Sequence, residues 1–158
     1  MSEVAEVISY PLNKIFRKSL ECGTVPKDWK QANVCAIFKK GKKSSPENYR
    51  PVSLTSHVCK IFESILKDRI VEHIDKYNLL STSQHGFVKN KSCLTNLLEF
   101  LTFVSTCVDD HKEVDVIYLD FQKAFDKVPH KRLLSKVKSF GISGKVYTWI
   151  ESWLIDRK

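Results

Sequence analysis

The sequence predicts an α+β fold that is rich in helices, because long amphipathic helical stripes alternate with only a few short apolar stretches. The longest stripe follows Thr55 or Ser56, either of which can cap a helix that continues to about residue 77. Three segments, at 32–38, 48–54 and 114–119, are apolar or proline-stiffened and are predicted to be extended. The length of 158 residues suits one domain.

Four further helices complete this prediction. The first spans 11–22, with Pro11 in its first turn, Gly23 as C-cap and Pro26 preventing continuation. A second spans about 92–108 and is expected to place one apolar face in the core; its members are Leu94, Leu97, Leu98, Leu101 and Val104. Two short helices end the chain. Residues 39–46 and 81–90 are predicted loops.

The charge balance favours an anionic partner. Twenty-six Lys and Arg residues against eighteen Asp and Glu leave a net charge of +8, which fits nucleic acid or phosphate better than a membrane; an inert basic surface is the alternative. The five cysteines form no C-x-x-C motif, so we expect reduced, mostly buried thiols of an intracellular protein. No secretory signal and no apolar run of membrane-spanning length are apparent.

The apolar run from Val114 to Leu119 ends at Asp120. A carboxylate at the end of a buried strand can hold a hard metal ion at the rim of a sheet. It can also cap a following helix, which is the preferred interpretation for such a junction taken alone. A phosphatase-type nucleophile is a third interpretation, but Gln122 stands where that chemistry usually has a second acid.

Other segments could assist a metal-bound phosphate. A lysine-rich arm precedes Arg50, whose guanidinium could grip a triphosphate, although a solvated arm and a surface ion pair are the simpler interpretations. The loop from Gln84 to Phe87 could admit and stack a nucleic-acid strand, or could be a plain loop with a buried Phe. Phe125 could wall a sugar pocket or pack in the core.

In this order, over roughly residues 11–158, the segments resemble a reverse transcriptase of the non-LTR (LINE-like) retrotransposon type. The segments that carry the resemblance are Gly23–Lys30, Ala36–Gly41, Asn48–Leu54, Lys60–Glu63, Gln84–Phe87, Lys91–Ser92, Tyr118–His130, which is similar to motif A of that family, and Gly141–Gly144. The resemblance implies one partial reverse transcriptase domain at 1–158, with fingers and connecting helices at about 11–110. The first part of a right-hand palm, with an incomplete antiparallel sheet, would occupy about 111–158.

The resemblance also implies roles for single residues. Asp120, helped by the backbone carbonyl of Phe121, would ligate the two catalytic Mg²⁺ ions, whereas Asp126 would be structural. Phe125 would be the steric gate that selects deoxynucleotides. The remaining implied contacts are Lys39 and Arg50 to the triphosphate and Gln84, Gly86 and Phe87 to the template. The implied partners are an RNA template, a DNA primer and a dNTP, with no membrane; the oligomeric state and the choice between nucleus and cytoplasm stay open.

The chain also departs from the family pattern. Two-metal chemistry holds ions about 4 Å apart with carboxylates from more than one strand, yet no aromatic-Ala-Asp-Asp hairpin or Pro-Gln-Gly block follows Asp120; Asp109 and Asp110 precede motif A. Lys89–Lys91 stands where the family more often has Gly-Arg. We therefore expect an N-terminal fragment that is inactive alone, with an unpaired strand edge and poor solubility. The alternative is a non-catalytic nucleic-acid-binding remnant of a decayed or domesticated element.

Overall fold

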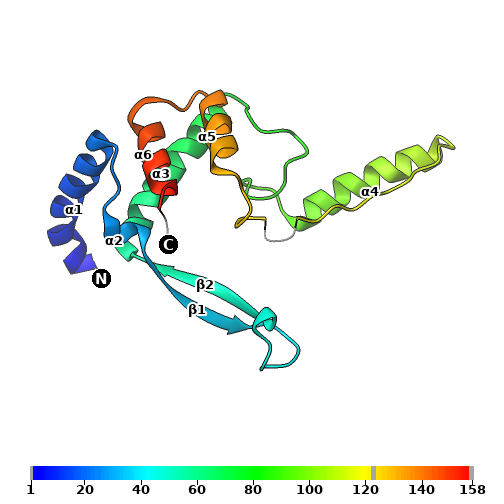
Figure 1. The fold of residues 1–158 in the computed structure, drawn as a ribbon. Helices are drawn as coiled ribbons and strands as arrows, with labels where there is room; N and C mark the ends of the chain where they lie inside the picture. The colour runs from blue at the N-terminus through cyan, green and yellow to red at the C-terminus, as the bar shows by residue number, and fades with distance from the viewer. Residues whose placement is uncertain (1, 122–123, 157–158) are drawn as a thin grey trace. The chain divides into compact units, whose positions relative to one another are not determined.

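The computed structural model describes residues 2–121 and 124–156 and has the predicted helix-rich α+β composition (Figure 1). Its elements, in chain order, are α1 (Ser2–Cys22), α2 (Lys27–Lys30), β1 (Ala32–Phe38), the 3₁₀ turn η1 (Pro46–Asn48), β2 (Tyr49–Thr55), α3 (His57–Lys76), α4 (Cys93–Asp109), α5 (His130–Ser139) and α6 (Gly144–Leu154).

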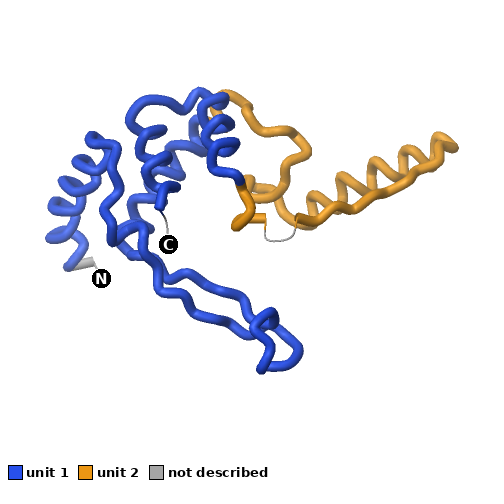
Figure 2. The backbone as a smooth tube through the Cα atoms, in the orientation of Figure 1, with its two compact units in different colours: residues 1–73, 129–158 blue, residues 74–128 orange. Residues whose placement is uncertain are grey.

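The elements fall into two compact units, which Figure 2 distinguishes by colour. Unit 1 comprises residues 1–73 and 129–158, and unit 2 comprises residues 74–128. These bounds follow compactness alone, so the predicted division into fingers and palm near residue 110 stays a prediction.

Helix α1 starts earlier than predicted, because it begins at Ser2 and contains Pro11 inside it. A proline removes the hydrogen bond from its own nitrogen to the carbonyl of Val7. The segment from Val4 to Tyr10 is exposed, so water can satisfy that carbonyl. The predicted C-cap is confirmed: Gly23 has φ +61, its N–H donates to Leu20 O at 3.2 Å, and Thr24 N–H donates to Ser19 O at 3.1 Å. This is the Schellman pattern, which favours glycine.

The core of unit 1 is aromatic and lies where α1, α2, α3 and α6 meet. The Phe62 ring of α3 stacks on Phe16 at 4.7 Å and meets Trp149 edge-on at 5.1 Å between centroids. Trp29 of α2 approaches both phenylalanines within 6.0 Å. The complete buried cluster is Phe16, Val25, Trp29, Cys59, Phe62, Leu66 and Trp149. The stripe predicted in α3 is therefore confirmed only in part: Phe62 and Leu66 are buried in this core, whereas Ile61 and Ile65 are about half exposed.

Strands β1 and β2 form an antiparallel hairpin, in register from Ala32 opposite Thr55 to Phe38 opposite Tyr49. Both predicted extended segments are confirmed. Most side chains of the hairpin are exposed, so the described part of unit 1 covers neither of its faces fully.

In unit 2, helix α4 forms as predicted, but its expected core face is exposed. Leu94, Leu97, Leu98 and Leu101 are all between 47% and 62% exposed. The prediction was wrong because helical periodicity locates an apolar face without supplying a second layer to cover it. Among the described residues of unit 2, no helix or sheet packs over this face.

The predicted strand at 114–119 is also not formed. Residues 113–121 adopt neither helix nor strand and run back along α4, where the Tyr118 ring lies 6.1 Å from that of Phe100 (Figure 1). A strand exists only through hydrogen bonds to a neighbour, and β1 and β2 pair with each other. Asp120 therefore does not end a strand, although the sequence had predicted that its strand would lack neighbours.

The cysteine prediction needs a correction as well. No cysteine of the described residues forms a disulfide. Only Cys59 is buried, and its thiol donates to Glu63 Oε1 at 3.2 Å, while Cys107 is half-buried and the other three are exposed. In the described ranges, no helix is both long and apolar enough to cross a membrane.

Candidate nucleic-acid and nucleotide site

The hairpin brings two predicted triphosphate contacts onto one face. Arg50 lies opposite Ile37, and Lys39 follows two residues after Ile37, with its N–H donating to Asn48 O at 2.8 Å. Because side chains alternate along a strand, Lys39 and Arg50 project from the same side. Both are exposed, so the two cations are free to meet an anion from solvent.

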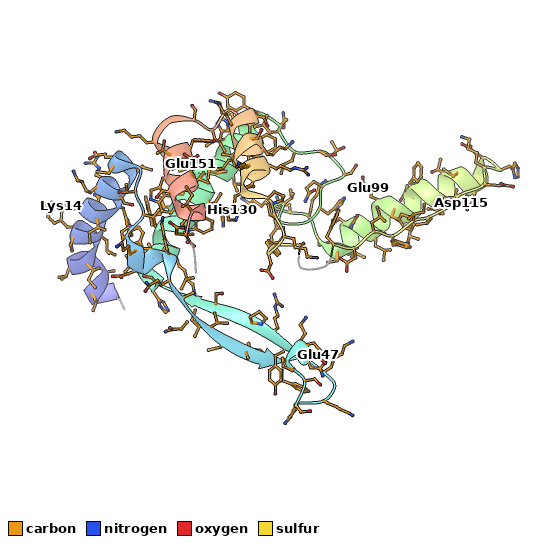
Figure 3. All side chains as sticks on the ribbon, in the orientation of Figure 1. Lys14, Glu47, Glu99, Asp115, His130 and Glu151 are labelled. Atoms are coloured by element: carbon orange, nitrogen blue, oxygen red, sulfur yellow. The ribbon has the colours of Figure 1, made fainter. Side chains whose placement is uncertain are left out.

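The lysine-rich loop at the hairpin tip is held by two side-chain hydrogen bonds to its own backbone carbonyls. Asn48 Nδ2 donates to the carbonyl of Lys42 at 2.9 Å, and Tyr49 Oη donates to the carbonyl of Lys43 at 2.8 Å. Gly41 has φ +88, and a Cβ there would lie 2.7 Å from the Asn48 amide. The loop contains four lysines and one acid, Glu47, labelled in Figure 3. It therefore presents a fixed, positively charged tip.

In unit 2, His85 anchors the predicted template loop to α4. Its side chain is only 7% exposed; Nε2 donates to Glu99 Oε2 at 2.7 Å, and Nδ1 lies 2.9 Å from Thr95 Oγ1. Thr95 also forms a capping box with Ser92 at the start of α4. Sequence reasoning missed this anchor, although the capping pair was a readable signal that α4 starts there. Glu99 is labelled on α4 in Figure 3.

Within this loop the backbone differs from expectation. Gln84 Nε2 donates to the carbonyl of Gly86 at 3.0 Å, so these two predicted template residues contact each other. The left-handed conformation belongs to Phe87, with φ +61, and not to Gly86. A non-glycine residue in that region is uncommon and stores about 1–2 kcal/mol of strain.

Phe87 meets Phe125, which joins the predicted template loop to the predicted nucleotide pocket. The ring centroids are 6.2 Å apart with an interplanar angle of 86°. Phe87 is 96% exposed and Phe125 is 82% exposed. These exposures rule out the simpler interpretations of a buried loop Phe and a core-packed Phe125, and they leave an aromatic pair open to solvent.

Asp120 and Phe121 lie in the exposed irregular segment after α4, and Phe121 is 80% exposed. The capping interpretation of Asp120 is excluded, because the next helix starts only at His130, with Pro129 as its N-cap residue. Gln122, which bore on the phosphatase interpretation, lies outside the described residues.

No group of three or more metal-ligating side chains occurs within residues 2–121 and 124–156. One carboxylate does not fit a two-ion centre, because both ions need carboxylates from more than one segment. The described residues thus do not form the implied Mg²⁺ site by themselves, and no catalytic step follows from them.

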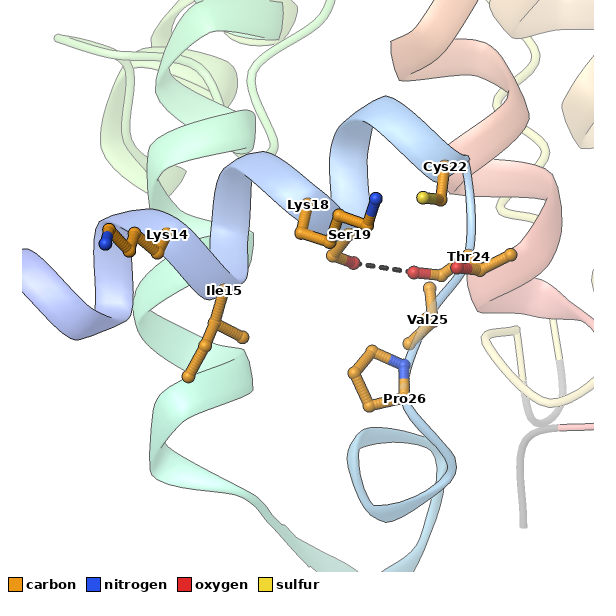
Figure 4. Close-up of a pocket in the computed structure, with 8 residues that line it drawn as sticks. All are labelled: Lys14, Ile15, Lys18, Ser19, Cys22, Thr24, Val25 and Pro26. Carbon is orange, nitrogen blue, oxygen red and sulfur yellow. Dashed lines mark hydrogen bonds between the residues drawn. The ribbon is translucent and has the colours of Figure 1, made fainter.

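The predicted site residues form two groups. Lys39 and Arg50 belong to unit 1, whereas the template loop, Asp120, Phe121 and Phe125 belong to unit 2. A pocket of unit 1, drawn in Figure 4, contains none of them. It opens beside α1, and its lining includes Ser19 and Thr24, whose side-chain hydroxyl and backbone carbonyl form a 2.6 Å hydrogen bond that Ser19 donates.

Comparison with known proteins agrees with the motif order. Residues 37–158 match the family described as reverse transcriptase (RNA-dependent DNA polymerase). The chain is 32% identical over 145 residues to the probable RNA-directed DNA polymerase from transposon BS of Drosophila melanogaster, covering 91% of this chain and 16% of that protein. It is 31% identical over 144 residues to the RNA-directed DNA polymerase from mobile element jockey of the same species, covering 90% and 16%.

A third relative is the Pol polyprotein from the type-1 retrotransposable element R2 of Popillia japonica. It is 28% identical over 134 residues, which cover 85% of this chain and 18% of that protein. The chain therefore spans less than a fifth of the length of these three relatives.

Proposed function

Because the chain belongs to the reverse transcriptase (RNA-dependent DNA polymerase) family, we propose that it supplies template and nucleotide contacts for RNA-directed DNA synthesis by a non-LTR retrotransposon polymerase. The partners in this proposal are an RNA template, a DNA primer and an incoming dNTP.

The observation that carries the proposal is the exposed pair of Phe87 and Phe125. Aromatic side chains left in water are unfavourable to the fold, and Phe87 in addition holds a strained backbone. Nucleic-acid bases stack on such rings regardless of their sequence. We assign Phe87, with Gln84 and Gly86, to the template, and Phe125 beside it to the sugar of the incoming nucleotide.

The hairpin supplies the charge in this proposal. Lys39 and Arg50 share one face and would neutralise the triphosphate, and a guanidinium can bind phosphate oxygens in bidentate fashion. The ordered lysine tip would meet the nucleic-acid backbone, where each phosphate contact releases counterions.

For the divalent ions we propose a partial role. Asp120 and the backbone carbonyl of Phe121 would provide two oxygen ligands for Mg²⁺, the hard cation that prefers such donors. Because the described residues include no larger group of ligands, we propose that the chain by itself binds nucleic acid and does not polymerise.

The test measures binding of a DNA primer annealed to a longer RNA template by fluorescence anisotropy. Phe87→Ala should weaken binding about 5- to 150-fold, since stacking contributes about 1–3 kcal/mol per base. Phe87→Tyr keeps the ring and should bind like the parent chain.

Phe103→Ala is the matched control, since Phe103 is an exposed phenylalanine of the same unit at 65% exposure. Equal affinities of the Phe87→Ala and Phe103→Ala variants would contradict the assignment of Phe87 to the template.

A further inference from the structure

Helix α5 lies in the longest stretch of the chain that contains no acidic residue. Residues 127–150 contain no Asp or Glu and six cations, which are Lys127, Lys131, Arg132, Lys136, Lys138 and Lys145. The whole chain has a net charge of +8, so this stretch concentrates much of the positive surplus.

The cations of α5 gather on one side. At about 100° per residue, they fall with two serines inside an arc of about 160°. We call this set the α5 basic face; its members are Lys131, Arg132, Ser135, Lys136, Lys138 and Ser139, all exposed. None of the salt bridges found among the described residues involves these cations.

Contacts of the other arc fix the orientation of α5 in unit 1. Leu134, Val137 and Phe140 are half-buried, and α5 packs on α6. His73 Nε2 lies 2.8 Å from the carbonyl of Phe140, where it can only donate. Gly141 closes the helix with φ +80. The basic face is thereby turned to solvent.

The first turn of α5 is electrostatically unfavourable to the helix. Lys131 and Arg132 lie at the positive end of the helix dipole, the first turn contains no acid, and the N-cap residue Pro129 makes no side-chain cap hydrogen bond. Lys136 and Lys138 lie at the opposite end, where cations stabilise a helix. Helix stability thus explains the second pair but not the first.

We propose that the α5 basic face binds the phosphate backbone of a nucleic-acid duplex, as a third contact surface besides the hairpin and the template loop. This rests on the proposed function, because it assumes that the chain binds nucleic acid. Lys131 and Lys138 are separated by about 10 Å along the helix, and a duplex has one charge per about 1.7 Å of its axis. Several phosphates therefore fall within reach of the face.

The fold favours a duplex over an anionic membrane. A surface-bound amphipathic helix inserts its apolar arc into the lipid boundary. Leu134, Val137 and Phe140 of the apolar arc are instead half-buried and α5 packs on α6, so the charged arc is the more accessible one.

The experiment compares three variants of the full chain, each lacking four cations, in anisotropy titrations with an RNA–DNA duplex over a salt series. The first variant replaces Lys131, Arg132, Lys136 and Lys138 by Gln. The matched control replaces four exposed cations of α1 and α3 by Gln, namely Lys14, Arg17, Lys18 and Lys60. The third replaces the hairpin lysines 39, 40, 42 and 43.

Log K falls as log salt rises, and each lost phosphate contact makes this slope shallower by about 0.9. The α5 variant should lose about 2–4 units of slope and at least about tenfold in affinity at low salt, while the control stays close to the parent. Equal behaviour of the α5 variant and the control would overturn the inference, and a weakened hairpin variant in the same data would leave the proposed function standing.

A double variant, Lys131→Gln with Arg132→Gln, guards against simple unfolding. Removing positive charge from the start of the helix relieves repulsion by the dipole, so its urea midpoint should equal or exceed that of the parent. Its slope should still fall by about 2. Unchanged duplex binding, with lost binding to phosphatidylserine vesicles, would assign the face to a membrane surface and overturn the inference.

Discussion

Replacing Ser19 by alanine is predicted to destabilise unit 1, because it leaves the buried indole N–H of Trp149 without its acceptor. Ser19 is 6% exposed and its hydroxyl accepts from Trp149 Nε1 at 2.9 Å while donating to the carbonyl of Thr24 at 2.6 Å. It thereby links α1 to α6 and to the turn after Gly23. Alanine removes both hydrogen bonds and adds no steric conflict.

The two lost bonds differ in consequence. Trp149 is 3% exposed, so its N–H would remain buried without a partner, which costs about 1–3 kcal/mol. Thr24 is exposed, so water can replace the bond to its carbonyl. Alanine is the better helix former by up to about 0.5 kcal/mol. The free energy of unfolding should therefore fall by about 1–3 kcal/mol.

The assay is urea unfolding followed by tryptophan fluorescence, which reports on unit 1 because Trp29, Trp149 and Trp153 all lie there. With an m-value of about 2 kcal/mol per M, the midpoint should fall by about 0.5–1.5 M. Ser9→Ala is the control on the same helix, since the exposed Ser9 only donates to the carbonyl of Glu6. Equal midpoints for the two variants would refute the assignment of a stabilising role to the Ser19 bridge.

Three further predictions concern the turn, the loop anchor and the chemistry. Gly23→Ala should lower the free energy of unfolding by at least about 2 kcal/mol, because φ is +61 and the new Cβ would lie 2.7 Å from Thr148 Cγ2. Adding Thr148→Ser removes that methyl group and should recover only the steric part of the loss. Full recovery, measured by urea unfolding, would argue against backbone strain. Glu99→Ala should speed hydrogen exchange in residues 81–90 about fivefold, as expected for losing about 1 kcal/mol, whereas Asp110→Ala, which removes the exposed pair with Lys112, should not. The isolated chain should not extend a DNA primer on RNA with Mg²⁺ and dNTPs, and robust synthesis would contradict the binding-only proposal.

Features determined by neighbouring residues were predictable from the sequence. Gly23 ends α1 because only a short local hydrogen-bond pattern is involved, and α3 forms where its own 3.6-residue apolar period predicts a helix. The start of α1 was predicted too late, because Pro11 was placed in the first turn. The helix in fact continues through Pro11, since water can satisfy the carbonyl that the proline leaves without a donor.

Features that depend on a distant partner were not predictable. The leucines of α4 form the expected stripe, but no periodicity can show whether another layer covers it. The run before Asp120 has strand-like composition and still forms no strand, because pairing is not a property of the run itself. The anchoring role of His85 depends on Glu99, fourteen residues away, and was invisible for the same reason.

The most direct test of the account is the salt dependence of binding between the chain and an RNA template annealed to a DNA primer. Binding through the lysine tip and the exposed Phe87–Phe125 pair predicts that log K falls linearly with log salt, with a slope of about −3.6 or steeper for four or more phosphate contacts. It also predicts residual affinity at high salt that Phe87→Ala abolishes. A salt-independent affinity, or no binding at low salt, would contradict the claim that this chain contacts the nucleic acid.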